Sequence, residues 1–143
     1  SNLLLFYTGF SRRSKIILGK QKNLSDQNNS EMIKNLQKIK KIGQKTKRLL
    51  EDGDFENFAN ILNDHWHEKK KRSKVMTNKK IDIWYEGALK NGALGGKLVG
   101  AGGGGFLMFY ANDKEKLKSY FKNLKVEEVN FNFDFEGTKI TMS

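Results

Sequence analysis

Apolar and polar positions along the chain predict a strand followed by a pair of amphipathic helices. Residues 3–8 ("LLLFYT") form a short, continuous apolar run, which is typical of a buried strand. Between about residues 30 and 50, apolar side chains recur every three or four positions, which predicts a long helix with one buried face. Gly53 suits the left-handed position after this helix, and Asp54 suits the cap of the next one.

Two further helices are indicated on either side of this pair. Ser11 is suited to cap a helix in the stretch that follows the first strand. The helix after Asp54 runs into the basic cluster "EKKKRSK" at residues 68–74. Residues 79–90 then repeat the helical spacing of apolar positions, and Gly92 is the expected end of that helix.

The last third of the chain predicts most of the sheet. "KLVG" and "FLMFYA" read as two strands, and the second is apolar at every position, as in a central strand covered on both sides. Asn112 is the expected cap of a helix, with Glu115 at the capping-box spacing. Apolar residues then alternate with polar ones over residues 129–135, which predicts a strand with one buried face, and "TKITMS" is its expected hairpin partner. This order of elements predicts an α+β domain in which an antiparallel sheet has helices on one face.

The composition limits the class of protein. A chain of 143 residues is long enough for one domain, and it contains no apolar run of the length that crosses a membrane. The lack of cysteine excludes disulfides and thiolate metal sites and fits a cytoplasmic protein. The net charge of +11 invites a nucleic-acid partner, but only four of the 27 basic residues are arginines, which argues against one. The cluster at 68–74 remains the best candidate for an anion-binding patch.

Glycine is concentrated in one stretch, "GALGGKLVGAGGGGFLMFYAND". Eight of the fourteen glycines lie between Gly92 and Gly105, and four of them are consecutive. Neither a Walker A loop nor a Rossmann fingerprint fits, because a strand rather than a helix follows the glycines. A simple hairpin would account for two glycines but not for four in a row. Consecutive glycines let the backbone approach a ligand closely and present N–H groups to an anion.

"KLVGAGGGGFLMF" resembles the third signature motif of the GHMP small-molecule kinases. "LLLFYTGFSRRS" resembles the start of the C-terminal half of their sugar-kinase branch, and "ILNDHWHEKKKRS" with "GALGGK" resembles the heptose 7-phosphate kinases and their fucokinase-like relatives. The resemblance covers residues 1–143 and implies a ferredoxin-like C-terminal domain with a four-stranded antiparallel sheet. It also implies an N-terminal domain with a proline-headed ATP loop, and this chain has no proline. By itself the chain is therefore expected to be inactive.

The resemblance also implies a site and its ligands. ATP and Mg²⁺ are expected to bind mainly through the N-terminal domain, and a sugar phosphate is the expected second substrate. Arg12, Lys97 and Lys69 are candidates for holding the phosphate of that sugar, and no catalytic or metal-binding residue is expected in this chain. The loop that faces the nucleotide phosphates would consist of Gly100, Ala101, Gly102, Gly103, Gly104 and Gly105.

Other interpretations stay open at this point. The chain could be a stand-alone basic ferredoxin-like module that binds RNA or a protein, in which case aromatic side chains should lie exposed on the sheet. The surface normally covered by the N-terminal domain could instead pair two copies of the chain. His65 and His67 lie on different sides of a helix and make a poor metal pair, and Trp66 is expected in the core.

Overall fold

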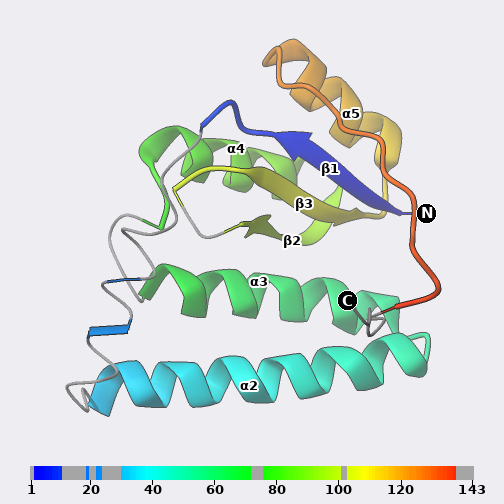
Figure 1. The fold of residues 1–143 in the computed structure, drawn as a ribbon. Helices are drawn as coiled ribbons and strands as arrows, with labels where there is room; N and C mark the ends of the chain where they lie inside the picture. The colour runs from blue at the N-terminus through cyan, green and yellow to red at the C-terminus, as the bar shows by residue number, and fades with distance from the viewer. Residues whose placement is uncertain are drawn as a thin grey trace, which may run out of the picture.

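A computed structural model describes residues 2–10, 19, 22–23, 30–71, 76–100 and 103–137. Figure 1 shows a small sheet with helices above, behind and below it. The elements in chain order are β1 (Leu3–Tyr7), α2 (Ser30–Glu51), α3 (Phe55–Lys71), α4 (Lys79–Lys90), β2 (Ala93–Val99), β3 (Phe106–Ala111) and α5 (Lys114–Asn123). In the stretch after Ser11, the described residues 19, 22 and 23 are helical, and Ser11 itself lies outside the described residues.

The sheet is antiparallel with the order β1-β3-β2, so the prediction that "FLMFYA" forms the central strand is confirmed. Residues 127–129 run along the outer edge of β1. There the Tyr7 N–H donates to the Glu127 carbonyl at 2.9 Å, and the Val129 N–H donates to the Leu5 carbonyl at 2.7 Å. The described residues form only one β-bridge at this edge. The expected four-stranded sheet is therefore not confirmed, and its fourth position holds a short extended segment.

The prediction of a strand with a buried face over residues 129–135 is wrong. Phe131, Phe133 and Phe135 are 39%, 50% and 94% exposed, and these rings contact one another at centroid distances of 5.4 and 6.3 Å. Beyond Val129 the described residues of this segment form no ladder with a neighbouring strand. Alternation of apolar and polar residues cannot supply that neighbour. "TKITMS" lies outside the described residues, so its predicted pairing as a hairpin partner stays a prediction.

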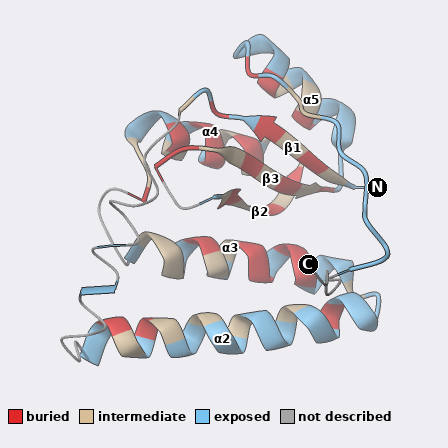
Figure 2. Cartoon of the chain, viewed as in Figure 1, coloured by how far each residue is buried: buried red, intermediate tan, exposed pale blue. Residues whose placement is uncertain are grey.

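Helices cover both faces of the sheet, so the expectation of helices on one face is also wrong. Side chains of β3 alternate between the two faces. Leu107 and Phe109 belong to a core cluster with α4 and α5, whereas Met108 and Tyr110 pack against a second cluster with Leu62 of α3. Helix α2 lies beyond α3, away from the sheet (Figures 1 and 2). An uninterrupted apolar strand needs cover on both sides, and the structure provides it.

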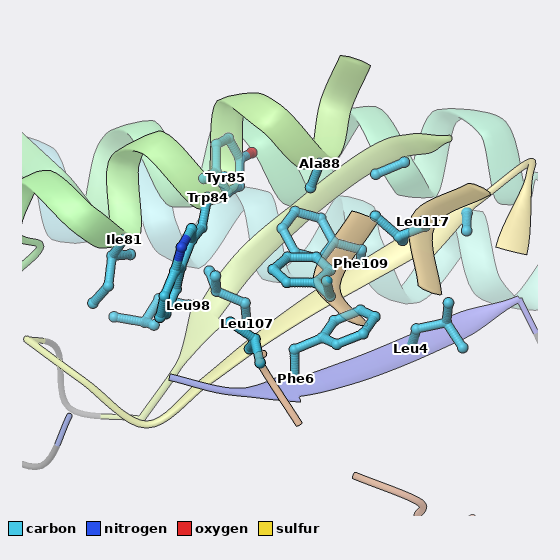
Figure 3. Packing of buried hydrophobic residues seen from close by; sticks show 14 of the residues in the cluster. Leu4, Phe6, Ile81, Trp84, Tyr85, Ala88, Leu98, Leu107, Phe109 and Leu117 are labelled. Atoms are coloured by element: carbon cyan, nitrogen blue, oxygen red, sulfur yellow. The ribbon is translucent and has the colours of Figure 1, made fainter. Parts of the chain in front are cut away.

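The main core lies between the sheet, α4 and α5 (Figure 3). Phe6 stacks on Phe121 with ring centroids 3.9 Å apart, which joins β1 to α5. Trp66 of α3 has no exposed surface, as the sequence predicted, and its ring lies 6.1 Å from that of Tyr85. The side chains of this cluster that Figure 3 labels are Leu4, Phe6, Ile81, Trp84, Tyr85, Ala88, Leu98, Leu107, Phe109 and Leu117.

Local capping signals set the helix ends. Gly53 has φ of 70°, and the Asp54 carboxylate accepts the Asn57 N–H at 3.2 Å, so both predictions at this boundary are confirmed. Helix α5 differs by one residue, because the Asp113 carboxylate, rather than the predicted Asn112, accepts the backbone N–H of Lys116 at 3.0 Å. Both side chains suit an N-cap, so composition alone does not choose between neighbours.

Candidate functional site

The glycine-rich loop lies at the end of the sheet where β2 turns into β3, at the left in Figure 1. Three other segments meet it there. Phe10 follows β1, Met76 precedes α4, and Lys69 belongs to the last turn of α3. Segments far apart in sequence thus hold one short loop.

Backbone hydrogen bonds hold the second half of this loop. The Gly103 N–H donates to the Met76 carbonyl at 2.8 Å, and the Gly105 N–H donates to the Phe10 carbonyl at 3.0 Å. The Gly105 carbonyl accepts both the N–H and the hydroxyl of Thr8, at 2.9 and 2.8 Å. Two N–H groups expected to face a phosphate are therefore used to fix the loop, so an anion would have to be met by other backbone groups.

Glycine is needed in this loop for two reasons. Gly100, Gly103 and Gly105 have φ of 122°, 72° and 106°, a region that other L-residues rarely adopt. Gly104 is needed for space, because a Cβ there would overlap the backbone carbonyl of Phe10. Part of the run is thus required by the fold itself. Ala101 and Gly102 lie outside the described residues.

The glycines of β2 belong to packing rather than to the loop. A Cβ on Gly95 would overlap the carbonyl of Ala59, because α3 lies directly on this strand. A Cβ on Gly96 would lie 2.5 Å from the Met108 carbonyl. The concentration of glycine in the sequence therefore combines two structural needs: a close helix–strand contact and a tightly held loop.

Lys69 contacts the start of the loop. Its ammonium donates to the Leu98 carbonyl at 3.2 Å and to the Gly100 carbonyl at 2.5 Å. The sequence suggested this residue only as a ligand for a substrate phosphate. The structure instead places its charge on two backbone carbonyls of the loop and its preceding strand.

Lys97 contacts α3. Its Nζ lies 3.1 Å from Nδ1 of His65, and burial lowers the pKa of this ammonium from its ordinary value of 10.5. Lys97 and Lys69 therefore both lie at the contact between α3 and β2. The ammonium of each one contacts other residues of this chain. Arg12, the third candidate for the sugar phosphate, lies outside the described residues.

Asn63 and Tyr85 form a polar network that the sequence did not suggest. Oδ1 of Asn63 accepts the Gly96 N–H at 3.0 Å and also accepts the Tyr85 hydroxyl, while its Nδ2 donates to the Leu94 carbonyl at 3.2 Å. The Tyr85 hydroxyl also lies 3.0 Å from the Gly96 carbonyl, and burial raises the pKa of this phenol. The network provides hydrogen-bond partners for the outer edge of β2, where none of the described strands pairs with it.

A further lysine lies next to Phe10, the residue that contacts the loop. Lys80 lies over the rings of Trp84 and Phe10, at 4.9 and 5.9 Å from their centroids. In the described part of the chain, no three His, Cys, Asp or Glu side chains are grouped as a metal site would require. The loop therefore combines backbone dipoles with nearby lysine charge.

Comparison with known proteins identifies the family. Residues 32–125 match the family described as GHMP kinases C terminal. The chain belongs to this family. Its match spans α2 to α5, and the glycine-rich loop lies inside it.

Relatives of known name agree with the GHMP assignment. The chain is 34% identical over 140 residues to D-glycero-alpha-D-manno-heptose 7-phosphate kinase from Campylobacter jejuni, covering 95% of this chain and 40% of that protein. It is 26% identical over 123 residues to the bifunctional fucokinase/GDP-fucose pyrophosphorylase of Arabidopsis thaliana, covering 86% of this chain and 12% of that protein. The crystal structure of L. major mevalonate kinase has the same fold, with a TM-score of 0.77 at 17% identity over 88% of this chain and 40% of that one.

The GHMP domain therefore spans well under half the length of the relatives that it matches. Among its described helices, none combines the length and the apolar character that a membrane crossing requires.

Proposed function

We propose that this GHMP domain forms one wall of the active site of an ATP-dependent sugar-phosphate kinase, which transfers the γ-phosphoryl group to a sugar hydroxyl. The observation that carries the proposal is the glycine-rich loop, held from three sides at one end of the sheet. The likeness to a heptose 7-phosphate kinase supports a heptose phosphate as the acceptor.

Phosphoryl transfer depends mainly on positioning and on stabilising the charge of the transferred oxygens. ATP would supply the phosphoryl group. We expect a phosphate to lie against Gly100, because this residue is exposed and its backbone is accessible. Gly100, Ala101, Gly102 and Gly104 would line that phosphate, while Gly103 and Gly105 keep the loop in place through their N–H groups.

Among the described residues, no three His, Cys, Asp or Glu side chains are grouped to hold a metal ion, so we place no Mg²⁺ ligand in this part of the chain. The catalytic base and the metal ligands would come from a part of the polypeptide outside residues 1–143, and the GHMP domain alone should not catalyse. Arg12 remains the candidate for the sugar phosphate, because Lys69 and Lys97 are engaged inside the domain.

The first test is the reading frame around Asn2 together with an assay. The proposal expects roughly 200 preceding residues, a typical domain length, with a phosphate-binding loop among them. The polypeptide as the gene encodes it should consume ATP when given heptose 7-phosphate. If Asn2 lies close to the natural start, or if no sugar phosphate is phosphorylated, the proposal fails.

A pair of glycine variants tests the loop itself. Gly104→Ala should displace the loop from Phe10 and lower kcat/KM by about 100-fold, the scale expected for a misplacement near 1 Å. Gly43→Ala is the matched control, because a Cβ there meets nothing within 4 Å in the middle of α2. Equal activity of the two variants would show that the loop is not part of the site.

The fold gives little support to the alternative that the chain is an RNA-binding module. Exposed phenylalanines are present at Phe131, Phe133 and Phe135, but they lie in the segment after the single β-bridge and not on the sheet. RNA recognition by a sheet of this type needs aromatic side chains on the strands themselves. Binding of single-stranded RNA by the wild-type polypeptide, without kinase activity, would favour this alternative.

A further inference from the structure

We propose that Lys69 is a positioning residue that sets the path of the chain from β2 into the glycine-rich loop. The proposal deepens the kinase function above and rests on it for its kinetic consequences. It assigns Lys69 a role different from that of a ligand for the substrate phosphate.

The geometry of the contact supports this role. The carbonyl of Leu98 belongs to β2, and that of Gly100 lies just beyond the end of this strand. The Lys69 ammonium, which has three N–H donors, contacts both of them, at 3.2 and 2.5 Å. Hydrogen bonds from a charged donor are roughly twice as strong as neutral ones. One side chain from α3 thus ties together the end of β2 and the first residue of the loop.

Gly100 needs a restraint from outside the loop, and Lys69 contacts its carbonyl. Gly100 has φ of 122°, and a glycine has little intrinsic preference for one backbone conformation. The second half of the loop is fixed independently, through Gly103 to Met76 and through Gly105 to Phe10 and Thr8. Lys69 supplies the corresponding restraint on the first half. Without it, Gly100 would be restrained only by its neighbour Val99, which pairs with Phe106 in the sheet.

Lys47 provides a control. It lies on α2, outside the basic cluster at 68–74, its side chain is 74% exposed, and its ammonium pairs with Glu51 at 3.6 Å. Lys69→Met and Lys47→Met each remove one positive charge from a long helix. A difference between the two variants therefore reports the contact with the loop rather than the loss of charge.

The kinetic test uses the polypeptide as the gene encodes it, with ATP and heptose 7-phosphate. Lys69→Met should lower kcat by about 100-fold with KM for the sugar phosphate within about threefold, because the loop matters in the transition state. Lys69→Arg should recover at least about tenfold of this loss, since a guanidinium also donates to two carbonyls. Lys47→Met should stay within about twofold of wild type. A large rise in KM for the sugar phosphate at unchanged kcat would overturn the proposal in favour of a substrate ligand.

Amide hydrogen exchange separates this proposal from the kinase function itself. In Lys69→Met, peptides that contain Leu98 and Gly100 should exchange faster, whereas peptides from the α2–α3 contact should not change. Faster exchange throughout α3, or no change in the loop, would overturn the positioning role. If the wild-type polypeptide phosphorylates no sugar phosphate, the proposed function fails, and the exchange result still decides the role of Lys69.

Discussion

Replacing Asn63 by alanine should release the outer edge of β2 from α3. Asn63 is the only described side chain seen to accept the N–H of Gly96, and it also donates to the Leu94 carbonyl. The Tyr85 hydroxyl loses one partner as well, but it keeps the Gly96 carbonyl, 3.0 Å away. The main cost of Asn63→Ala is therefore the buried Gly96 N–H left without an acceptor.

The magnitude follows from the groups that lose a partner. A buried donor without an acceptor costs about 1–3 kcal/mol, and the lost bond to the partly buried Leu94 carbonyl adds about 1 kcal/mol. The sum is about 2–4 kcal/mol. Since about 1.4 kcal/mol corresponds to a factor of ten, the middle of this range predicts roughly 100-fold faster local opening of β2.

Amide hydrogen exchange of a peptide covering β2 measures this opening in the intact polypeptide, without requiring two-state unfolding of every domain. Asn60→Ala is the control, because Asn60 is exposed on the same helix, and alanine there should change stability by a few tenths of a kcal/mol at most. Tyr85→Phe completes a double-mutant cycle with Asn63→Ala, in which a coupling of at least about 0.5 kcal/mol is expected. Exchange of β2 that is equally slow in Asn63→Ala and Asn60→Ala would refute the reasoning.

Three other predictions concern stability. Gly43→Ala in α2 should raise the free energy of unfolding by about 1 kcal/mol in a denaturant titration, because it removes an exposed helical glycine with free space around it; a loss would contradict this. Gly95→Ala should cost about 1–3 kcal/mol or more in the same titration, because its Cβ would overlap the Ala59 carbonyl; a neutral result would mean that α3 does not lie on β2 as described. Between the lowered pKa of Lys97 and pH 10, the free energy of unfolding should rise with pH, because the unfolded chain binds more protons there than the folded chain. Melting temperatures measured over this pH range should therefore rise, and Lys97→Met should make that rise smaller. Above pH 10 the raised pKa of Tyr85 acts in the opposite direction, so the comparison ends there, and identical slopes for both proteins would contradict the prediction.

The parts of the fold that depend on nearby residues were predictable from the sequence. The helical spacing of apolar residues located α2, α3 and α4, and the uninterrupted apolar run located β3 at the centre of the sheet. Gly53 and Asp54 marked a helix boundary through backbone and capping preferences that act within a few residues. The resemblance of the glycine motif to the GHMP kinases was also readable without a structure, because the motif is contiguous.

Features that need a partner distant in sequence were not predictable. Alternation over residues 129–135 suggested a buried strand, yet Phe135 is 94% exposed, since burial depends on what lies opposite. The second face of the sheet is covered by α3, which pattern alone did not place there. Asn63 carried no signal, because an asparagine on a helix becomes important only when a strand edge presents an N–H to it.

By itself the sequence determined most of the helices and strands, where a glycine-rich loop lies and which family the chain resembles, because those properties depend mainly on short-range spacing. Only the tertiary structure decided what each glycine and lysine does. Gly95 lets α3 approach β2, Gly104 makes room for Phe10, and Lys69 binds the start of the loop rather than standing free for a substrate. The physical reason is that steric overlap and hydrogen bonding act over a few ångströms in space, between residues that the chain places dozens of positions apart.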